Sequence, residues 1–144
     1  MVETIAVGTD GSETAERAVE FAMDMAERYG AKLVLASAYI PAPESRVNRE
    51  KRDAPQDIQW SINPSEDVDA TLRAAEERAE SRGLRYASEA RTGDPADVLC
   101  DIASDADADL IVVGSQGMQR RILGSVPNSV SHKAPCSVLI VKTS

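Results

Sequence analysis

Two kinds of hydrophobic pattern alternate along this sequence. Short runs of aliphatic and β-branched residues, such as 4–7 and 109–113, predict buried strands. Between such runs, apolar residues recur with the i, i+3, i+4, i+7 spacing of one helix face, most clearly over 12–29. The whole chain therefore predicts the order β-α-β-loop-α-β-α-β-α-β.

Individual residues set the expected boundaries. Gly30 and Gly83 are placed to end helices, and Asp94 followed by Pro95 is typical of a helix start. We expect strands at 4–7, 32–38, 84–91, 109–113 and 137–141, and helices over 12–29, from 64 to before Gly83, from Pro95 onward and over 125–133.

Strands rich in Val, Ile and Leu and separated by helices imply a parallel sheet that is covered on both faces. We therefore expect an α/β fold in which residues 1–144 form a single doubly wound domain, with a five-stranded parallel sheet in the order 3-2-1-4-5. In such sheets ligands bind beyond the carboxyl ends of the strands, where the strand order reverses. The first and fourth strands are expected to meet at that point.

One segment departs from this alternation. Residues 40–64 contain four prolines, no glycine and charges of both signs. A connection of this length is either a functional lid or a mobile, solvated insertion.

Composition and charge narrow the functional classes. The chain has 144 residues and 42% apolar residues, but no run approaches the ~18 apolar residues of a membrane span. Its net charge of −8 argues against general binding to nucleic acids. The amino terminus lacks the basic start of a signal peptide, so we expect a cytoplasmic protein that binds neither membrane nor nucleic acid.

The two cysteines, Cys100 and Cys136, lie within apolar stretches and are expected to act as small buried hydrophobic residues. A metal or redox site is the alternative. It is disfavoured because His132 is the only histidine and no CxxC pair occurs.

Candidate chemistry gathers in two turns at strand ends. Gly8, Thr9 and Asp10 follow the first strand. After the fourth strand, Gly114, Gly117 and Gly124 lie within eleven residues, and Ser125 stands at a helix start. Bare backbone beside a helix N-terminus suits a phosphate or nucleotide, although glycines also end strands and helices for conformational reasons alone.

Known phosphate motifs do not match this segment. No lysine precedes Ser125, as the Walker pattern requires, and the dinucleotide pattern GxGxxG is absent. Asp10 has two open roles. Its carboxylate either accepts hydrogen bonds from ribose hydroxyls or binds Mg²⁺, or it forms a capping box with Glu13.

These residues resemble the universal stress protein family. The resemblance covers essentially the whole chain and rests on VGTDGS at 7–12, Gly93-Asp94-Pro95, and Gly124-Ser125-Val126 followed by APC and VLIV. The segments SAYIP and GSVPNSVSHKAPCSVLIVKT are similar in particular to an actinobacterial branch, some members of which bind cyclic AMP.

The resemblance implies a homodimeric protein of the stress response that binds an adenine nucleotide and is not a fast enzyme. It also implies pairing of two copies through strand 137–142. We expect ATP first and AMP or cyclic AMP next, with Mg²⁺ through Asp10. By the same resemblance, the nucleotide would contact Gly8, Thr9, Asp10, Ala38, Val113, Gly114, Gly117, Gly124, Ser125 and Val126. Asn128 is a further candidate, and Arg120 and Arg121 are candidate phosphate partners.

The glycine segment departs from the family. Nucleotide-binding members resemble the pattern Gly-two-Gly-nine-Gly-Ser, whereas six residues, 118–123, separate Gly117 from Gly124 here. Three fewer residues shorten this loop by up to ~10 Å of extended chain, which affects triphosphate binding more than binding of the nucleoside. Arg120 and Arg121 either offset this loss by pairing with phosphate or are solvated.

No nucleophile and base are visible together, so we expect no catalytic site, or at most slow ATP hydrolysis.

Two other classes of protein remain open at this point. A response-regulator receiver shares the sheet plan, but its acceptor Asp is missing from the third strand, which ends at Arg91-Thr92. The other alternative is a dimeric interaction module of the same fold that binds no nucleotide.

Overall fold

The computed structural model describes residues 1–39, 64–115 and 126–143. Five parallel strands form one sheet in the order β3-β2-β1-β4-β5, which confirms the predicted α/β class and strand order. The strands are β1 (Thr4–Gly8), β2 (Lys32–Tyr39), β3 (Tyr86–Thr92), β4 (Leu110–Gly114) and β5 (Ser137–Val141). The predicted insertion at 40–64 lies outside the described residues, apart from its last position.

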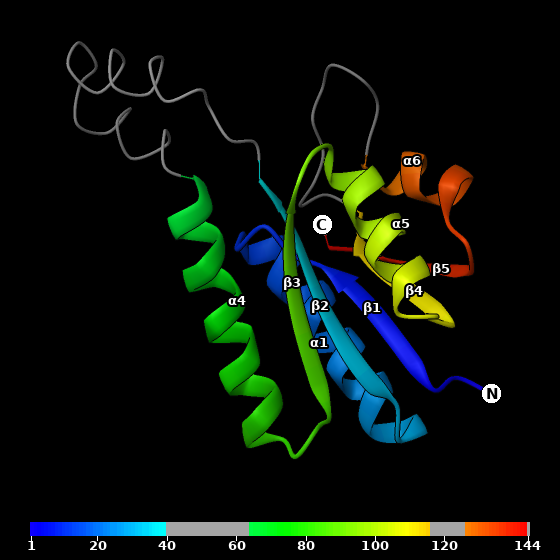
Figure 1. Cartoon of the computed structure of the whole chain (residues 1–144). Coiled ribbons are helices and arrows are strands. Elements are labelled where there is room, and N and C mark those ends of the chain that lie inside the picture. Colours follow the sequence, from blue (N-terminus) through cyan, green and yellow to red (C-terminus); the bar gives the residue numbers. More distant parts are fainter. Residues whose placement is uncertain (40–63, 116–125, 144) are drawn as a thin grey trace, which may run out of the picture.

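Helices cover both faces of this sheet (Figure 1). The helices α1 (Glu13–Tyr29) and α4 (Pro64–Ser81) share one face, and α5 (Pro95–Asp105) and α6 (Val126–Lys133) share the other. Alternation along β1 sends Ile5 and Val7 toward α1 and Ala6 toward α5. Two apolar cores result, one on each side of the sheet.

The predicted helix ends are confirmed where the structure describes them. Gly30 ends α1 with φ of 64°, a left-handed conformation, and its N–H and that of Ala31 bond to the last carbonyls of the helix. Asp94 precedes α5, and its carboxylate accepts hydrogen bonds from the N–H groups of Ala96 and Asp97 at 3.1 and 3.2 Å. These local signals suffice to place both boundaries.

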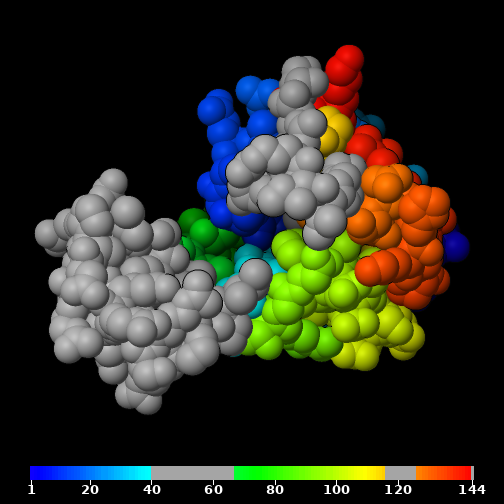
Figure 2. All heavy atoms as spheres, turned by 90° about the horizontal axis from the view of Figure 1, so that it is seen from above, coloured from blue at the N-terminus to red at the C-terminus, as the bar shows by residue number. Residues whose placement is uncertain are grey.

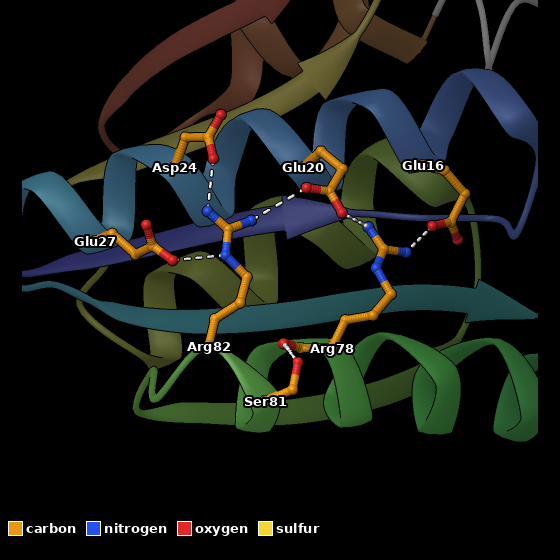
Figure 3. Close-up of polar contacts among 7 residues, drawn as sticks. All are labelled: Glu16, Glu20, Asp24, Glu27, Arg78, Ser81 and Arg82. Carbon is orange, nitrogen blue, oxygen red and sulfur yellow. Dashed lines mark hydrogen bonds and ion pairs between the residues drawn. The ribbon is translucent and has the colours of Figure 1, made fainter.

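Arg78 of α4 and Arg82, which directly follows this helix, contact carboxylates along α1 (Figure 3). Arg82 contacts three carboxylates at 2.6 to 3.1 Å, and Arg78 contacts two. Their partners are Glu16, Glu20, Asp24 and Glu27, one for nearly every turn of α1. The two helices are thus connected by charge as well as by the apolar core.

The cysteines occupy the α5 side of the fold. Cys100 is buried, as predicted, and Cys136 is half-buried. Burial raises the pKa of both thiols. Within the described ranges, no group of three His, Cys, Asp or Glu side chains could hold a metal ion, and no helix is long and apolar enough to cross a membrane.

Candidate functional site

A cavity of about 170 Å³ opens at the carboxyl ends of β1 and β2, beside α5. Figure 2 looks onto this end of the molecule, where the cyan end of β2 lies against the yellow-green atoms of α5. The described lining consists of Gly8, Thr9, Asp10, Ala36, Ser37, Ala38, Pro95, Val98, Leu99 and Val126. The cavity therefore lies at the sheet edge where a doubly wound fold binds its ligands.

Small residues create the floor of this cavity. Ala6 and Ala36 pack in the core on the α5 side of the sheet, and strand alternation places Gly8 and Ala38 on that same side, one step closer to the carboxyl edge. Because these positions carry at most a methyl group, α5 and the strand ends leave space between them. The predictions for Gly8 and Ala38 thus fall on residues that line one site.

The wall opposite the strands comes from two helices, and only its Val126 was among the predicted site residues. Pro95, Val98 and Leu99 belong to the first turns of α5, and Val126 begins α6. Their positions could have been predicted, because a helix that follows a parallel strand starts at the carboxyl edge of the sheet. The Gly93-Asp94-Pro95 helix start was the available signal.

The turn after β1 is fixed by hydrogen bonds to β2. The N–H of Thr9 donates to the carbonyl of Ala36 at 2.9 Å, and the Ser37 hydroxyl donates to the Thr9 carbonyl at 2.7 Å. The Thr9 hydroxyl accepts from the Gly11 N–H at 3.2 Å, and Thr9 is only 3% exposed. Thr9 is therefore a rigid support, and Ser37 is a supporting residue that the sequence reasoning missed.

Asp10 stands at the tip of this turn. Its Oδ1 accepts the Ser12 N–H at 2.9 Å, and Ser12 itself caps α1 by accepting the Ala15 N–H at 3.1 Å. The alternative in which Asp10 forms a capping box with Glu13 is therefore wrong, because Glu13 is the first residue of the helix and Asp10 precedes the cap by two residues. An ionised carboxylate accepts several hydrogen bonds, so Asp10 retains capacity for a ligand hydroxyl.

Three predicted residues are not part of the described lining of the cavity. Val113 is fully buried in the core on the α5 side, and Asn128 is exposed on α6. A side chain at Gly114 would meet the Thr143 methyl at 3.2 Å and the Thr14 carbonyl at 3.5 Å, so this glycine faces α1. The predictions for Gly117, Arg120, Arg121, Gly124 and Ser125 fall outside the described residues.

The described lining is mostly apolar and carries one charged group, the carboxylate of Asp10. Apolar walls with a few fixed polar groups are typical of a small-molecule site. The fold and the cavity together are typical of an α/β protein with a small-molecule site at the carboxyl edge of its sheet.

Comparison with known proteins identifies the family. The family model described as the universal stress protein family matches residues 1–142. The chain therefore belongs to the universal stress protein family, as its motifs predicted. The receiver interpretation is wrong.

Similar proteins of known name and structure span nearly the whole chain. A universal stress protein of Mycobacterium tuberculosis is 39% identical over 145 residues, which cover 98% of this chain and 97% of that protein. A crystal structure of a universal stress protein in complex with cAMP is 37% identical, with a TM-score of 0.77 and 99% of each chain covered. A universal stress protein from Archaeoglobus fulgidus in complex with dAMP is 25% identical, with a TM-score of 0.70 over 99% of this chain and all of that one.

Proposed function

We propose that this protein binds an adenine nucleotide in the cavity at the carboxyl ends of β1 and β2. The observation that carries this proposal is the cavity itself, which combines a floor of Gly8, Ala36 and Ala38 with the Asp10 carboxylate at its rim. Related structures in complex with cAMP and with dAMP support the choice of an adenine nucleotide.

The described part of the cavity suits the nucleoside end of such a ligand. It offers apolar surface for a base and a carboxylate for ribose hydroxyls, and its described lining contains no Lys or Arg to pair with phosphate. Ligands with one phosphate, cyclic AMP and AMP, depend least on further basic groups. We therefore place them before ATP, whose additional phosphates would need Arg120 and Arg121 or Mg²⁺ at Asp10.

We propose binding rather than catalysis as the role of this site. The only charged side chain in the described lining is Asp10, and a lone exposed carboxylate beside apolar walls gives no nucleophile–base pair. Such a protein acts in a stress response through the nucleotide it holds, in a cytoplasmic setting that remains a prediction from the sequence.

We also propose that the protein forms a homodimer through β5. This strand is at the edge of the sheet, and Ile140 on it is 45% exposed. An edge strand with an exposed large apolar residue is a template for pairing with another strand. The same observation favours the alternative function, a dimeric interaction module, if no nucleotide binds.

Calorimetric titration with cyclic AMP, AMP and ATP tests the nucleotide proposal. In the variant Ala38→Leu, a larger side chain fills the cavity from the end of β2, so binding should be lost while the protein stays folded. Ala70→Leu makes the same change at an exposed position of α4 and should bind as the wild type does. Saturable binding to the wild type and to Ala70→Leu, but not to Ala38→Leu, supports the site; absence of heat with every nucleotide at millimolar concentration rejects the function.

A further inference from the structure

Thr143 lies beyond the last strand, and yet it is only 2% exposed. The strand β5 ends at Val141. Thr143 lies between the carboxyl end of β4 and the first turns of α1, where its methyl group approaches Gly114. A residue outside regular structure is buried to this extent only when specific contacts hold it.

Hydrogen bonds from two distant segments provide these contacts. The Thr143 N–H donates to the Ser115 hydroxyl oxygen at 3.1 Å, and the Thr143 carbonyl accepts from Nη1 of Arg17 at 2.9 Å. The hydroxyl groups of Ser115 and Thr143 are 3.4 Å apart, and the Ser115 N–H donates to the Val141 carbonyl at 2.8 Å. Thr143 therefore connects the end of β4 to α1.

Gly114 makes room for this connection. A Cβ atom at Gly114 would lie 3.2 Å from Cγ2 of Thr143, closer than most real contacts, and 3.7 Å from Cβ of Ala18. Every larger residue at position 114 would thus push Thr143 away from α1. The glycine, the threonine and the helix form one packed unit.

This unit adjoins the cavity on the opposite side of the sheet. The strand β4 pairs with β1, and α1 starts directly after the turn that contains Thr9 and Asp10. The described lining of the cavity contains neither Arg17, Ser115 nor Thr143. Through the described lining, these three residues can affect a ligand only by placing other groups.

We propose that Arg17, Ser115 and Thr143 form a clamp that positions the nucleotide site. The clamp holds the end of β4 against α1 and so keeps the turn that contains Asp10 in place beside it. This proposal rests on the proposed function, because it assumes that the nucleotide binds at that turn. The three are positioning residues, and none of them belongs to the described lining of the cavity.

Two variants open the clamp in different ways. Arg17→Gln removes the charged donor to the Thr143 carbonyl, and Ser115→Ala removes the acceptor of the Thr143 N–H. Each variant should bind cyclic AMP about fivefold or more weakly than the wild type, the usual lower end of coupling between distant groups. Arg28→Gln, which makes the same change of charge near the other end of α1, should bind as the wild type does, and Arg17→Lys should restore most of the affinity.

The Ser115→Ala variant separates positioning from simple charge. If Arg17 acted only through long-range attraction of phosphate, Arg17→Gln would weaken binding and Ser115→Ala would not. The backbone amide NMR chemical shifts of Gly11 and Ser12 in nucleotide-free protein give a second readout. They should shift in both clamp variants and stay unchanged in Arg28→Gln.

These outcomes distinguish the clamp proposal from the proposed nucleotide binding on which it rests. If the wild type binds cyclic AMP and both clamp variants bind it equally well, the clamp is purely structural and the proposal is overturned while the function stands. If the wild type binds no nucleotide, the proposed function fails, and unshifted Gly11 and Ser12 signals in the variants would then reject the clamp separately.

Discussion

A substitution at Gly11 tests how closely the turn that contains Asp10 packs against α4. Its φ is 82°, in the left-handed region, and a Cβ placed on it would lie 2.7 Å from Oγ1 of Thr71 on α4. The substitution Gly11→Ala therefore meets two obstacles, backbone strain and a collision. Gly30 provides the matched control, because its φ is 64° and a Cβ there would meet nothing within 4 Å.

The expected magnitudes follow from these two geometries. A left-handed conformation costs an ordinary residue about 1–2 kcal/mol, and alanine recovers about 0.4–1 kcal/mol by restricting the unfolded chain. The free energy of unfolding should thus fall by about 0–1.5 kcal/mol for Gly30→Ala. Gly11→Ala adds an overpacking cost of about 1–3 kcal/mol and should lose about 1–4 kcal/mol in total.

A double-mutant cycle measures the part of this cost that comes from the collision with Thr71. The free energy of unfolding in urea is compared for the wild type, Gly11→Ala, Thr71→Ala and the double variant. Thr71→Ala removes the colliding oxygen, so Gly11→Ala should cost about 1–3 kcal/mol less in that background than in the wild type. With an m-value of about 2 kcal/mol/M, this difference shifts the midpoint by about 0.5–1.5 M urea. Equal costs of Gly11→Ala in both backgrounds would refute the contact between the turn and α4.

Three further predictions test other parts of the fold. Asp94→Ala should lower the free energy of unfolding by about 1 kcal/mol through loss of the α5 cap, and Asp94→Ser should keep most of it. Arg82→Gln should lower the urea midpoint at low salt, and the deficit should shrink in about 1 M NaCl, where charges are screened. Hydrogen bonds from the Glu3 and Thr4 N–H groups lower the pKa of Asp109 in the folded protein. The Asp109 carboxylate therefore stabilises the fold above its unfolded pKa, and this effect is lost as the pH falls through the lower folded pKa. Asp109→Asn should be less stable than the wild type at pH 7 and should lose less stability than the wild type on acidification to about pH 3.

The sequence was sufficient for features that depend on neighbouring residues. Gly30 and Asp94 set helix boundaries through contacts within a few positions, so their roles could be predicted from residue type and spacing. The strand order followed from connectivity, because parallel strands joined by helices admit few arrangements. The turn after β1 was predicted to reach the site for the same reason.

Features that depend on distant residues could not be predicted. The Ser37 hydroxyl supports Thr9 across two strands, and no local pattern distinguishes it from an exposed serine. Gly114 was predicted to contact a ligand because glycines cluster after β4. In the structure, its missing side chain admits Thr143, which is 29 positions later in the chain.

Gly11 and Gly114, which lie near the start of α1, both make room for a threonine that is distant in the sequence. Each lies in a segment that follows or ends a strand at the sheet's reversal point, and each lacks a side chain where a distant threonine approaches, Thr71 in one case and Thr143 in the other. The residues that shape the site are therefore held by α4 and by the segment after β5, neither of which contributes to the described lining of the cavity. Substitutions that alter nucleotide affinity should consequently occur in these supports as well as in the cavity walls, and the substitutions on α4 should act through Gly11 and those after β5 through Ser115.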